Sequence, residues 1–549
     1  MNLPILPYLF FTFFLFLNVV VLPSCTNQEE QVTINQTVSA PVPFRGGIYR
    51  VPLRSNPTTL DPAYVQDIYG IALVHQLFNG LVRFDPYLSV LPDLAETWQV
   101  KEEGKVYRFT LRENAHFHNL ETVTSKDVVF SISRLLRALP APAVLPHLLK
   151  IVGAKEYRAG TIERVQGLAI ENEKIFTVRL EESHAPFLTA LGMYQAAIVP
   201  QKEVLRLGNE FGSYPMGTGP FRFMSWEEGK TVRLKRFDDY YAGPAFLDEI
   251  HYKIYPGGQD PLVLSDFQAG ALEEMAVYGN RREKLSEIKG LQWFHRPSLS
   301  LFFYGMNMQH PNLANPELRK ALSIAVDREA FVNKIYKAQF EIARTILPPG
   351  MPGYSPLNRM ADDTPEFALQ QLEQSIGKRV KNLPELEIVS AIQTPLVEQE
   401  MDMIKGFWAK IGIKLRVKYI SDWKEFEAYL GSRDVQIYRY AWFADMPDAD
   451  SFLHSLFASE SPTNFMGFQD ERVDQMLLTA RGIVEPVRRA KMYQEIEKKI
   501  MTTTPLIPLF YMNVDRVYQP YVKSITVNAL GAHTMPLNRI WLENAPPGN

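Results

Sequence analysis

Three aspartates, Asp445, Asp448 and Asp450, follow an apolar, aromatic-rich run that begins at Ile437. The run predicts a strand, and Pro447 predicts that the strand gives way to a loop. A loop carboxylate beyond a strand end, beside large aromatic side chains, can hold the cationic end of an extended ligand that pairs with the strand. The alternative is an acidic loop without a ligand, as many α/β proteins carry.

The elements that must position these acids alternate between strand and helix. We expect strands at Leu386–Val389, Ile413–Tyr419 and Val435–Trp442, and helices at Leu396–Ile411 and Trp423–Leu430. This β-α-β-α-β order is typical of a doubly wound sheet, in which ligands bind beyond the carboxyl ends of the strands. Asp445 would lie at such an end.

Further elements are expected nearer the amino terminus. Strands are predicted at Gly47–Leu53 and Val106–Leu111, and helices at Val128–Leu136 and Glu317–Val326. Thr124 to Asp127 fits a capping box before the first helix, and Asn315 followed by a proline opens the second.

Motifs for catalysis are mostly absent. Gly229-Lys-Thr231 ends like a phosphate-binding loop, but Met224 stands where its first glycine is needed. His116 and His118 would share one face of a strand, yet no third metal ligand is evident nearby. With no nucleophile–base pair and no cofactor motif, the chain fits a binding protein better than an enzyme.

The first residues predict export. Leu9 to Val21 is almost entirely apolar, and at ~1.5 Å per residue it makes a helix of about 20 Å, too short to span a bilayer. It reads as the core of a secretory signal. The segment that follows it, Leu22-Pro-Ser-Cys25, resembles the lipobox of bacterial lipoproteins, although no basic residue precedes the apolar run and Pro23 replaces a small residue.

Cys25 is the only cysteine of the 549 residues, so no disulfide can form within one chain. The position favours lipidation of Cys25, with ordinary secretion as the alternative. Residues 26–44 are polar and predict a flexible tether between anchor and folded body.

Composition sets further bounds. With a formal charge of −3 and a pI near 6.4, the chain lacks the excess of basic residues that is typical of nucleic-acid-binding proteins. With 46% apolar residues the chain can build real cores, and the length after the tether suffices for two to four domains of ~100–200 residues each.

Several separated segments together resemble family 5 solute-binding proteins of ABC importers, which bind oligopeptides, dipeptides or nickel. The resemblance covers roughly Gly46 to Leu542 and rests on motifs that occur in order: Ser55 to Pro62, Leu77 to Asp85, Pro92 to Trp98, Tyr107 to Arg112, Pro215 to Phe221, and Asn307 to Glu329. One segment departs from it: Phe117-His-Asn-Leu-Glu-Thr122 stands where the family writes F-x-D-G-T-P.

The resemblance implies an α/β, two-lobed periplasmic-binding-protein fold (type II-like, cluster C) with an extra inserted domain and a ligand cleft between the lobes. Residues 1–25 would be the lipoprotein signal peptide and lipobox. Lobe I would comprise 44–78, 193–296 and 505–549, the inserted lobe II 79–192, and lobe III 297–504. Two chain crossings, near Pro297–Tyr304 and Thr504–Pro508, would form a hinge that closes on ligand.

For function, the resemblance implies capture of di- to oligopeptides outside the cytoplasm. A peptide-like solute would pass to the permease and ATPase of an ABC importer, while a lipid on Cys25 anchors the protein in a membrane. No cofactor, metal or nucleic-acid partner is implied. The alternative is the same scaffold with a non-peptide solute: a nickel chelate, haem, an opine or an oligosaccharide.

The resemblance also implies site residues. In the family, the carboxylate at the place of Asp445 holds the peptide ammonium, and Arg439 falls where some relatives bind a carboxylate. The remaining expected contacts are backbone or pocket-wall groups of Tyr440, Ala441, Trp442, Phe443, Gln66, Asp67 and Ile68. For Asp445 a turn cap, for Arg439 a structural ion pair, and for the aromatics a core position remain alternatives.

Overall fold

The computed structural model describes residues 43–544 except 280, 359–363, 378–382 and 433, and Pro43–Asn549 form one compact unit. The expected signal segment and Cys25 lie outside the described residues. Among those described, no helix is both long and apolar enough to cross a membrane.

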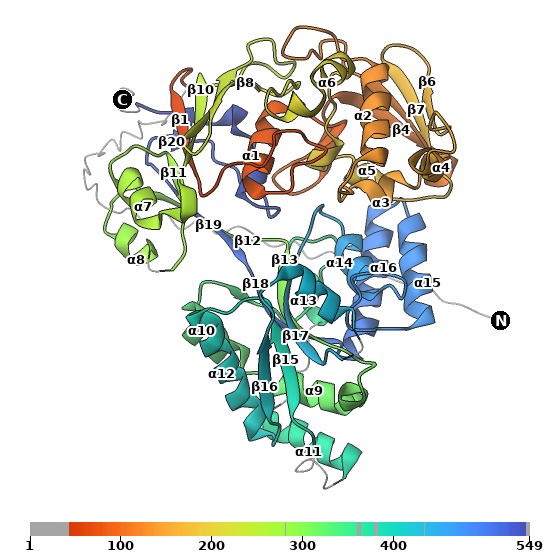
Figure 1. The fold of residues 1–549 in the computed structure, drawn as a ribbon, viewed down its shortest axis with the longest axis vertical. Coiled ribbons are helices and arrows are strands. Elements are labelled where there is room, and N and C mark those ends of the chain that lie inside the picture. Colours follow the sequence, from red (N-terminus) through yellow and green to blue (C-terminus); the bar gives the residue numbers. More distant parts are fainter. Residues whose placement is uncertain (1–42, 280, 359–363, 378–382, 433, 545–549) are drawn as a thin grey trace, which may run out of the picture. The chain divides into compact units, whose positions relative to one another are not determined.

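Three larger sheets organise this unit (Figure 1). The first has the order β1 (Ile48–Leu53), β10 (Glu249–Ile254), β9 (Thr231–Arg236) and β8 (Phe221–Glu227). The second, within the predicted insertion, has the order β4 (Ala95–Lys101), β5 (Val106–Leu111), β7 (Ile175–Arg179) and β6 (Leu168–Ile170). The third has six strands: β14 (Glu341–Ile342), β18 (Leu506–Tyr511), β13 (Ser300–Met306), β17 (Ile437–Phe443), β15 (Leu386–Ser390) and β16 (Leu415–Tyr419).

Smaller sheets complete the topology. One has the order β11 (Glu274–Ala276), β19 (Asn513–Tyr518) and β12 (Gln292–Pro297), and two hairpin-like pairs join β2 (Val82–Phe84) to β3 (Val90–Pro92) and β20 (Val522–Lys523) to β21 (Trp541–Leu542).

Alternating side chains bury both faces of the six-stranded sheet. On β13, Tyr304 and Met306 join one core cluster, whereas Leu301 and Phe303 join another. The first cluster includes side chains of α9 (Pro316–Ile324), α10 (Arg328–Tyr336) and α12 (Pro395–Lys410). The second includes side chains of α13 (Trp423–Leu430), α14 (Asp450–Phe457), α15 (Glu471–Gly482) and α16 (Pro486–Met501). Helices therefore cover both faces, as expected for a doubly wound sheet.

The predicted β-α-β-α-β unit is confirmed. β15, α12, β16, α13 and β17 follow in that order, and β15 pairs in parallel with both β16 and β17. The sheet is mixed rather than purely parallel, because β13 pairs antiparallel with β17 and with β18.

The amino-terminal elements also agree with the sequence. β1 and β5 cover the two predicted strands, and α2 (Ser125–Arg137) begins where the backbone N–H of Thr124 donates to Asp127 Oδ2 at 3.0 Å. Asn315 caps α9 by accepting from Glu317 N at 2.8 Å.

The chain crosses twice between the six-stranded sheet and the β11-β19-β12 sheet, and one predicted crossing is displaced. β12 leads into β13 through Ser298 and Leu299, within the predicted segment. The other crossing lies at Met512, between β18 and β19, and not at Thr504–Pro508. The expected boundary at residue 505 is therefore wrong: β18 pairs with β13 and β14, so its apolar residues belong to the six-stranded sheet.

Candidate functional site

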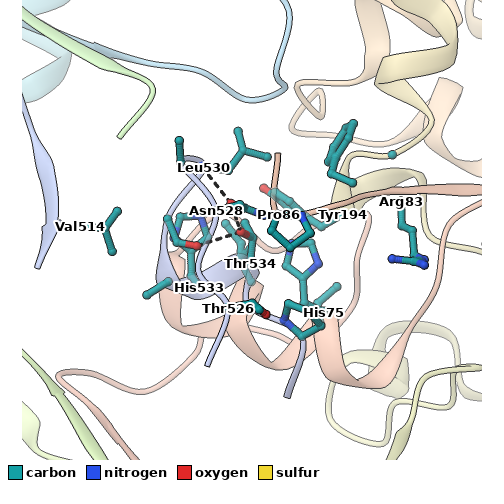
Figure 2. Close-up of a pocket in the computed structure, with 18 of the residues that line it drawn as sticks. His75, Arg83, Pro86, Tyr194, Val514, Thr526, Asn528, Leu530, His533 and Thr534 are labelled. Atoms are coloured by element: carbon teal, nitrogen blue, oxygen red, sulfur yellow. Dashed lines mark hydrogen bonds between the residues drawn. The ribbon is translucent and has the colours of Figure 1, made fainter. Parts of the chain in front are cut away.

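A cavity of about 1350 Å³ is lined by segments from many parts of the chain. They include α1 (Ile68–Leu77), the β2 and β3 strands, the end of β17 and the carboxyl-terminal stretch from Ser524 to Arg539. This volume exceeds the range of roughly 300–1,000 Å³ that is typical of small-molecule sites, so the cavity has room for a larger solute. Figure 2 shows part of the lining, with His75, His533 and Thr534 close to one another and Arg83 apart from them.

The three aspartates after β17 have different surroundings. Asp448 accepts from both terminal nitrogens of Arg489 at 2.7 Å, and Asp450 accepts from Arg481 at 2.7 and 2.8 Å. Asp445 lines the cavity and has no hydrogen bond or ion pair among the described contacts. The same loop thus carries two neutralised carboxylates and one that is free.

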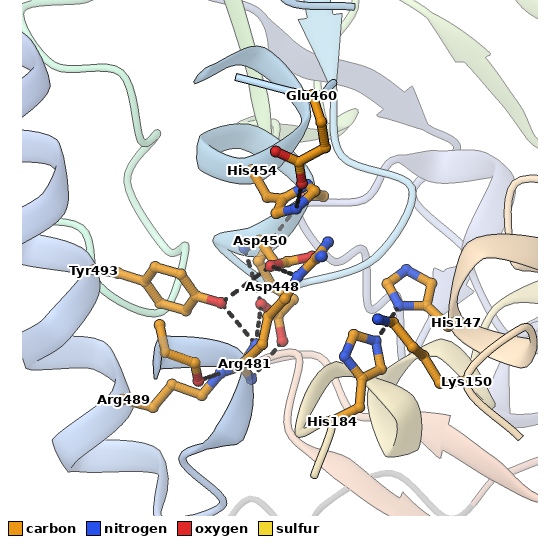
Figure 3. Close-up of polar contacts among 12 residues, drawn as sticks. His147, Lys150, His184, Asp448, Asp450, His454, Glu460, Arg481, Arg489 and Tyr493 are labelled. Atoms are coloured by element: carbon orange, nitrogen blue, oxygen red, sulfur yellow. Dashed lines mark hydrogen bonds and ion pairs between the residues drawn. The ribbon is translucent and has the colours of Figure 1, made fainter. Parts of the chain in front are cut away.

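The two ion pairs hold this loop between elements of the body (Figure 3). Arg481 and Arg489 come from α15 and α16, and both pairs are largely buried. On the other side, Met446 packs into the core of the predicted insertion. His147 and His184 of that insertion hydrogen-bond to each other at 2.9 Å, and burial lowers the pKa of His147 to about 4.

Two further contacts fix the chain on either side of Asp445. Ala444 N donates to Leu299 O at 2.9 Å, and the indole Nε1 of Trp442 donates to Ser451 O at 2.7 Å. The Asp445 carboxylate is reachable from the cavity, yet the surrounding protein displaces much of its hydration and raises its pKa. A cation that entered the cavity would relieve this cost. Asp445 caps no turn or helix among the described contacts.

Arg439 lies in an ion pair inside the body. Its Nε is 3.0 and 3.1 Å from the two carboxylate oxygens of Glu400, and its guanidinium stands 5.3 Å from the centre of the Phe302 ring. Tyr304 and Tyr336 also donate to Glu400. Arg439 is not among the residues that line the cavity, so the structural ion pair is the alternative that the geometry favours.

The predicted site residues of β17 also differ in whether they line the cavity. Phe443 lines the cavity together with Ala444, whereas Tyr440, Ala441 and Trp442 do not. Tyr440 stacks with Trp423 and Phe426. Both Tyr440 and Trp442 pack against the core cluster that includes Leu301 and Phe303.

Gln66 and Ile68 line the cavity from the segment that enters α1. Asp67 between them is the cap of this helix: its carboxylate accepts from Tyr69 N, Gly70 N and both donors of Thr58. The structure therefore places two of these three predicted residues at the cavity.

Several cavity residues were not predicted. His75 projects from α1, His533 comes from the carboxyl-terminal stretch, and burial lowers their pKa values to about 3 and about 4. Tyr194 packs edge-on against His75, and its pKa is raised by burial and by the nearby charges of Asp445 and Asp67. No local pattern joins these three positions. Arg83, Asp93 and Arg112, which also line the cavity, do lie within segments that carried the family resemblance.

The described residues contain no group of three or more His, Cys, Asp or Glu side chains that could hold a metal ion. His118, one of the two histidines weighed as a metal pair, instead lies 3.1 Å from Gly219 O and accepts from Gly217 N at 3.2 Å.

Comparisons with known proteins agree with this architecture. A family model described as "Bacterial extracellular solute-binding proteins, family 5 Middle" matches residues 89–464. The dipeptide-binding protein of Escherichia coli K12 is 25% identical over 477 residues, which cover 83% of this chain and 88% of the relative. Heme-binding protein A of Haemophilus influenzae is 25% identical over 475 residues, covering 83% of this chain and 85% of the relative.

The fold is similar to that of a solved periplasmic binding protein from Helicobacter pylori in complex with the peptide STSA. The TM-score is 0.72 at 21% identity, and the match covers 91% of this chain and 99% of the other.

Proposed function

Because this chain belongs to family 5 of the bacterial extracellular solute-binding proteins, we propose that it captures di- to oligopeptides outside the cytoplasm and delivers them to an ABC importer. The observation that carries the proposal is the free carboxylate of Asp445 at the cavity, beside two aspartates that are already neutralised. A carboxylate that faces the cavity without a counter-charge is suited to bind a cationic group of the ligand.

The proposed partner of Asp445 is the α-ammonium of the peptide. Two unit charges ~4 Å apart attract by ~4 kcal/mol at an effective dielectric of ~20, before the cost of removing water is subtracted. That energy suffices to fix the register of an extended peptide, with side chains of Phe443, Gln66 and Ile68 as further proposed contacts.

Backbone pairing with β17 would supply affinity that does not depend on peptide sequence. β15 pairs with β17 only at Ile437 and Tyr438. Beyond Tyr438, the edge of β17 opposite β13 has no strand neighbour among the described residues, so an extended peptide could add there as a strand. Contacts of Tyr440, Ala441 and Trp442 through their backbone remain part of the proposal.

The second candidate is a non-peptide solute such as haem or a metal chelate. His75 and His533 both face the cavity, and burial keeps both imidazoles neutral at neutral pH, the form that ligates metals (Figure 2). A relative named for haem binding is consistent with this candidate.

Two steps test the proposal. Protein purified from its native source should be denatured and refolded to strip bound solute, and the released material analysed by mass spectrometry; peptides are the expected result, and haem or a chelate in their place would favour the second candidate. Calorimetric titration with tri-alanine should then show that Asp445→Asn weakens binding by about 2–5 kcal/mol, because the ammonium loses its counter-charge.

The matched control is Asp434→Asn, since Asp434 is an exposed carboxylate ahead of the same strand. N-acetylated tri-alanine should bind wild type poorly, and Asp445→Asn should change that little. If Asp445→Asn bound both peptides as wild type does, the carboxylate would not be the amine anchor.

For the amino terminus we propose that Cys25 is lipidated and anchors the protein in a membrane, on the resemblance of Leu22 to Cys25 to a lipobox. Cys25→Ser should move the protein to the soluble fraction and abolish labelling by a palmitate analogue. Unchanged membrane association of this variant would refute the anchor.

A further inference from the structure

Arg83 is a cation in the cavity wall without a hydrogen-bond or ion-pair partner among the described contacts. It is the middle residue of β2, where Val82 is buried and Arg83 is exposed because successive side chains of a strand point to opposite faces. Figure 2 shows its guanidinium at the cavity, separate from the group around His75 and His533. The short β2–β3 pairing, with Arg83 opposite Leu91, fixes its backbone.

The surroundings of Arg83 form a polar cluster. The Asp93 carboxylate accepts from Asn79 Nδ2 at 3.0 and 3.3 Å and from the hydroxyl of Tyr241, which in turn accepts from the Tyr240 hydroxyl at 3.2 Å. All of these residues line the cavity. Asp93 is thus held by neutral donors, and Arg83 is close enough to act on its charge without an ion pair between them.

A second arginine of this cluster is already engaged. Arg112 Nε donates to the backbone oxygen of Asp93 at 2.7 Å, and its guanidinium lies 5.3 Å from the centre of the Tyr241 ring. Its Nη1 lies 3.8 Å from Oε1 of Glu96. Arg112 therefore stiffens the wall and adds positive potential. The planar guanidinium of Arg83 keeps its donors for a ligand.

We infer that Arg83 binds a carboxylate of the captured solute, as a second anchor besides Asp445. A guanidinium presents paired donors whose geometry matches a carboxylate, and such bidentate pairs are the stronger kind of ion pair. The inference rests on the proposed function, and it makes the preferred solute one that carries both an ammonium and a carboxylate.

The carboxylate can come from the peptide carboxyl terminus or from an acidic side chain. Three probes distinguish these sources in calorimetric titration of refolded, ligand-free protein: tri-alanine, tri-alanine amide and Ala-Glu-Ala amide. Wild type should bind tri-alanine about 10- to 100-fold more tightly than its amide, and Arg83→Gln should remove that preference. If Ala-Glu-Ala amide also recovers tight binding in wild type but not in Arg83→Gln, the site accepts a side-chain carboxylate.

Matched variants separate a specific anchor from general attraction. Arg164→Gln changes an exposed arginine of the insertion that does not line the cavity, and it should leave all three affinities unchanged. Arg83→Lys should retain part of the preference for the free carboxylate, because lysine keeps the positive charge but lacks the paired donors of a guanidinium. Arg539 also lines the cavity; an equal loss in Arg539→Gln and Arg83→Gln would overturn the inference by showing attraction without a specific site.

Failure of the inference is distinguishable from failure of the proposed function. If wild type and Arg83→Gln bind all three peptides alike, peptide capture stands and the Arg83 anchor is overturned. If wild type binds none of the peptides, peptide capture fails, and haem is compared with its dimethyl ester. A preference for haem that Arg83→Gln removes would then support the carboxylate anchor; equal binding, or binding of neither, would overturn it.

Discussion

Arg489 and Asp448 form a two-pronged ion pair in which each terminal guanidinium nitrogen lies 2.7 Å from one carboxylate oxygen. Together with Arg481 and Asp450, this pair ties the loop after β17 to α15 and α16. The loop presents Asp445 to the cavity from a rigid base. Rigid placement favours binding because little order must be created when the ligand arrives.

The first prediction concerns the stability of that base. Arg489→Gln leaves Asp448 buried without its counter-charge, so the free energy of unfolding should fall by about 3–5 kcal/mol. Urea unfolding followed by circular dichroism measures this. Arg488→Gln, the exposed neighbour, should change it by no more than about 0.5 kcal/mol. Equal stability of the two variants would show that the pair contributes nothing.

The second prediction concerns Trp442. Trp442→Phe keeps an aromatic ring in the core but removes the indole donor to Ser451 O. The loss should cost about 1–2 kcal/mol of stability and loosen the loop that carries Asp445, so tri-alanine should bind several-fold more weakly. Calorimetry is the readout, with Trp293→Phe on β12 as control, since Trp293 does not line the cavity. Unchanged affinity in Trp442→Phe would mean that the indole does not position the loop.

The third prediction is a pH dependence of binding. Because its surroundings raise the pKa of Asp445, the carboxylate becomes protonated at a higher pH than an ordinary aspartate does. Only the ionised form attracts the ammonium, so affinity for tri-alanine should decline as pH falls through this raised pKa. The decline should be absent in Asp445→Asn; an identical pH profile in the two proteins would contradict the assignment.

The raised pKa of Asp445 has the opposite effect on the stability of the ligand-free protein: a higher pH favours binding of the ammonium but lowers the free energy of unfolding. A carboxyl group whose pKa is higher folded than unfolded contributes stability below its unfolded pKa and loses it as pH rises through the folded pKa. Asp445→Asn should therefore raise the thermal midpoint at pH 7.5 relative to wild type, and have less effect at pH 3.5. A higher thermal midpoint in the variant would show that Asp445 lowers the stability of the ligand-free protein at the position where it serves binding.

The fourth prediction concerns Leu120, which occupies the glycine position of the F-x-D-G-T-P motif of the family. Its φ is 69°, a left-handed conformation that costs a residue with a Cβ about 1–2 kcal/mol. Because the side chain is 59% exposed, little packing is lost on truncation. Leu120→Gly should stabilise the protein by about 0.5–1 kcal/mol after the extra chain entropy of glycine is subtracted. Leu120→Ala keeps the strain and should not stabilise; equal gains in both variants would exclude the backbone explanation.

The fifth prediction concerns closure about the two crossings at Ser298–Leu299 and Met512. We propose that they form the hinge, since they join the six-stranded sheet to the β11-β19-β12 sheet. X-ray scattering should show a smaller radius of gyration with tri-alanine than without it, while far-ultraviolet dichroism stays the same. Identical scattering profiles with saturating peptide would argue against a hinge here.

Local patterns sufficed for much of the fold. Helical spacing along α12, alternation in β16 and the apolar run of β17 predicted each element, because periodicity records which side of an element meets the core. The acid after β17 could be placed at a strand end for the same reason. The crossing at residue 505 was misplaced because an all-apolar strand such as β18 carries no signal for the sheet it joins.

What the sequence could not determine is which charged group remains free. Asp445, Asp448 and Asp450 are chemically alike and five positions apart at most, yet only the packing of α15 and α16 brings Arg481 and Arg489 to the last two, from 31 and 41 residues away. Likewise Arg439 meets Glu400 across 39 residues, whereas Arg83 has no hydrogen-bond or ion-pair partner among the residues that the structure describes. The strength of an ion pair depends on distance in space, and sequence spacing does not report that distance until the chain has folded.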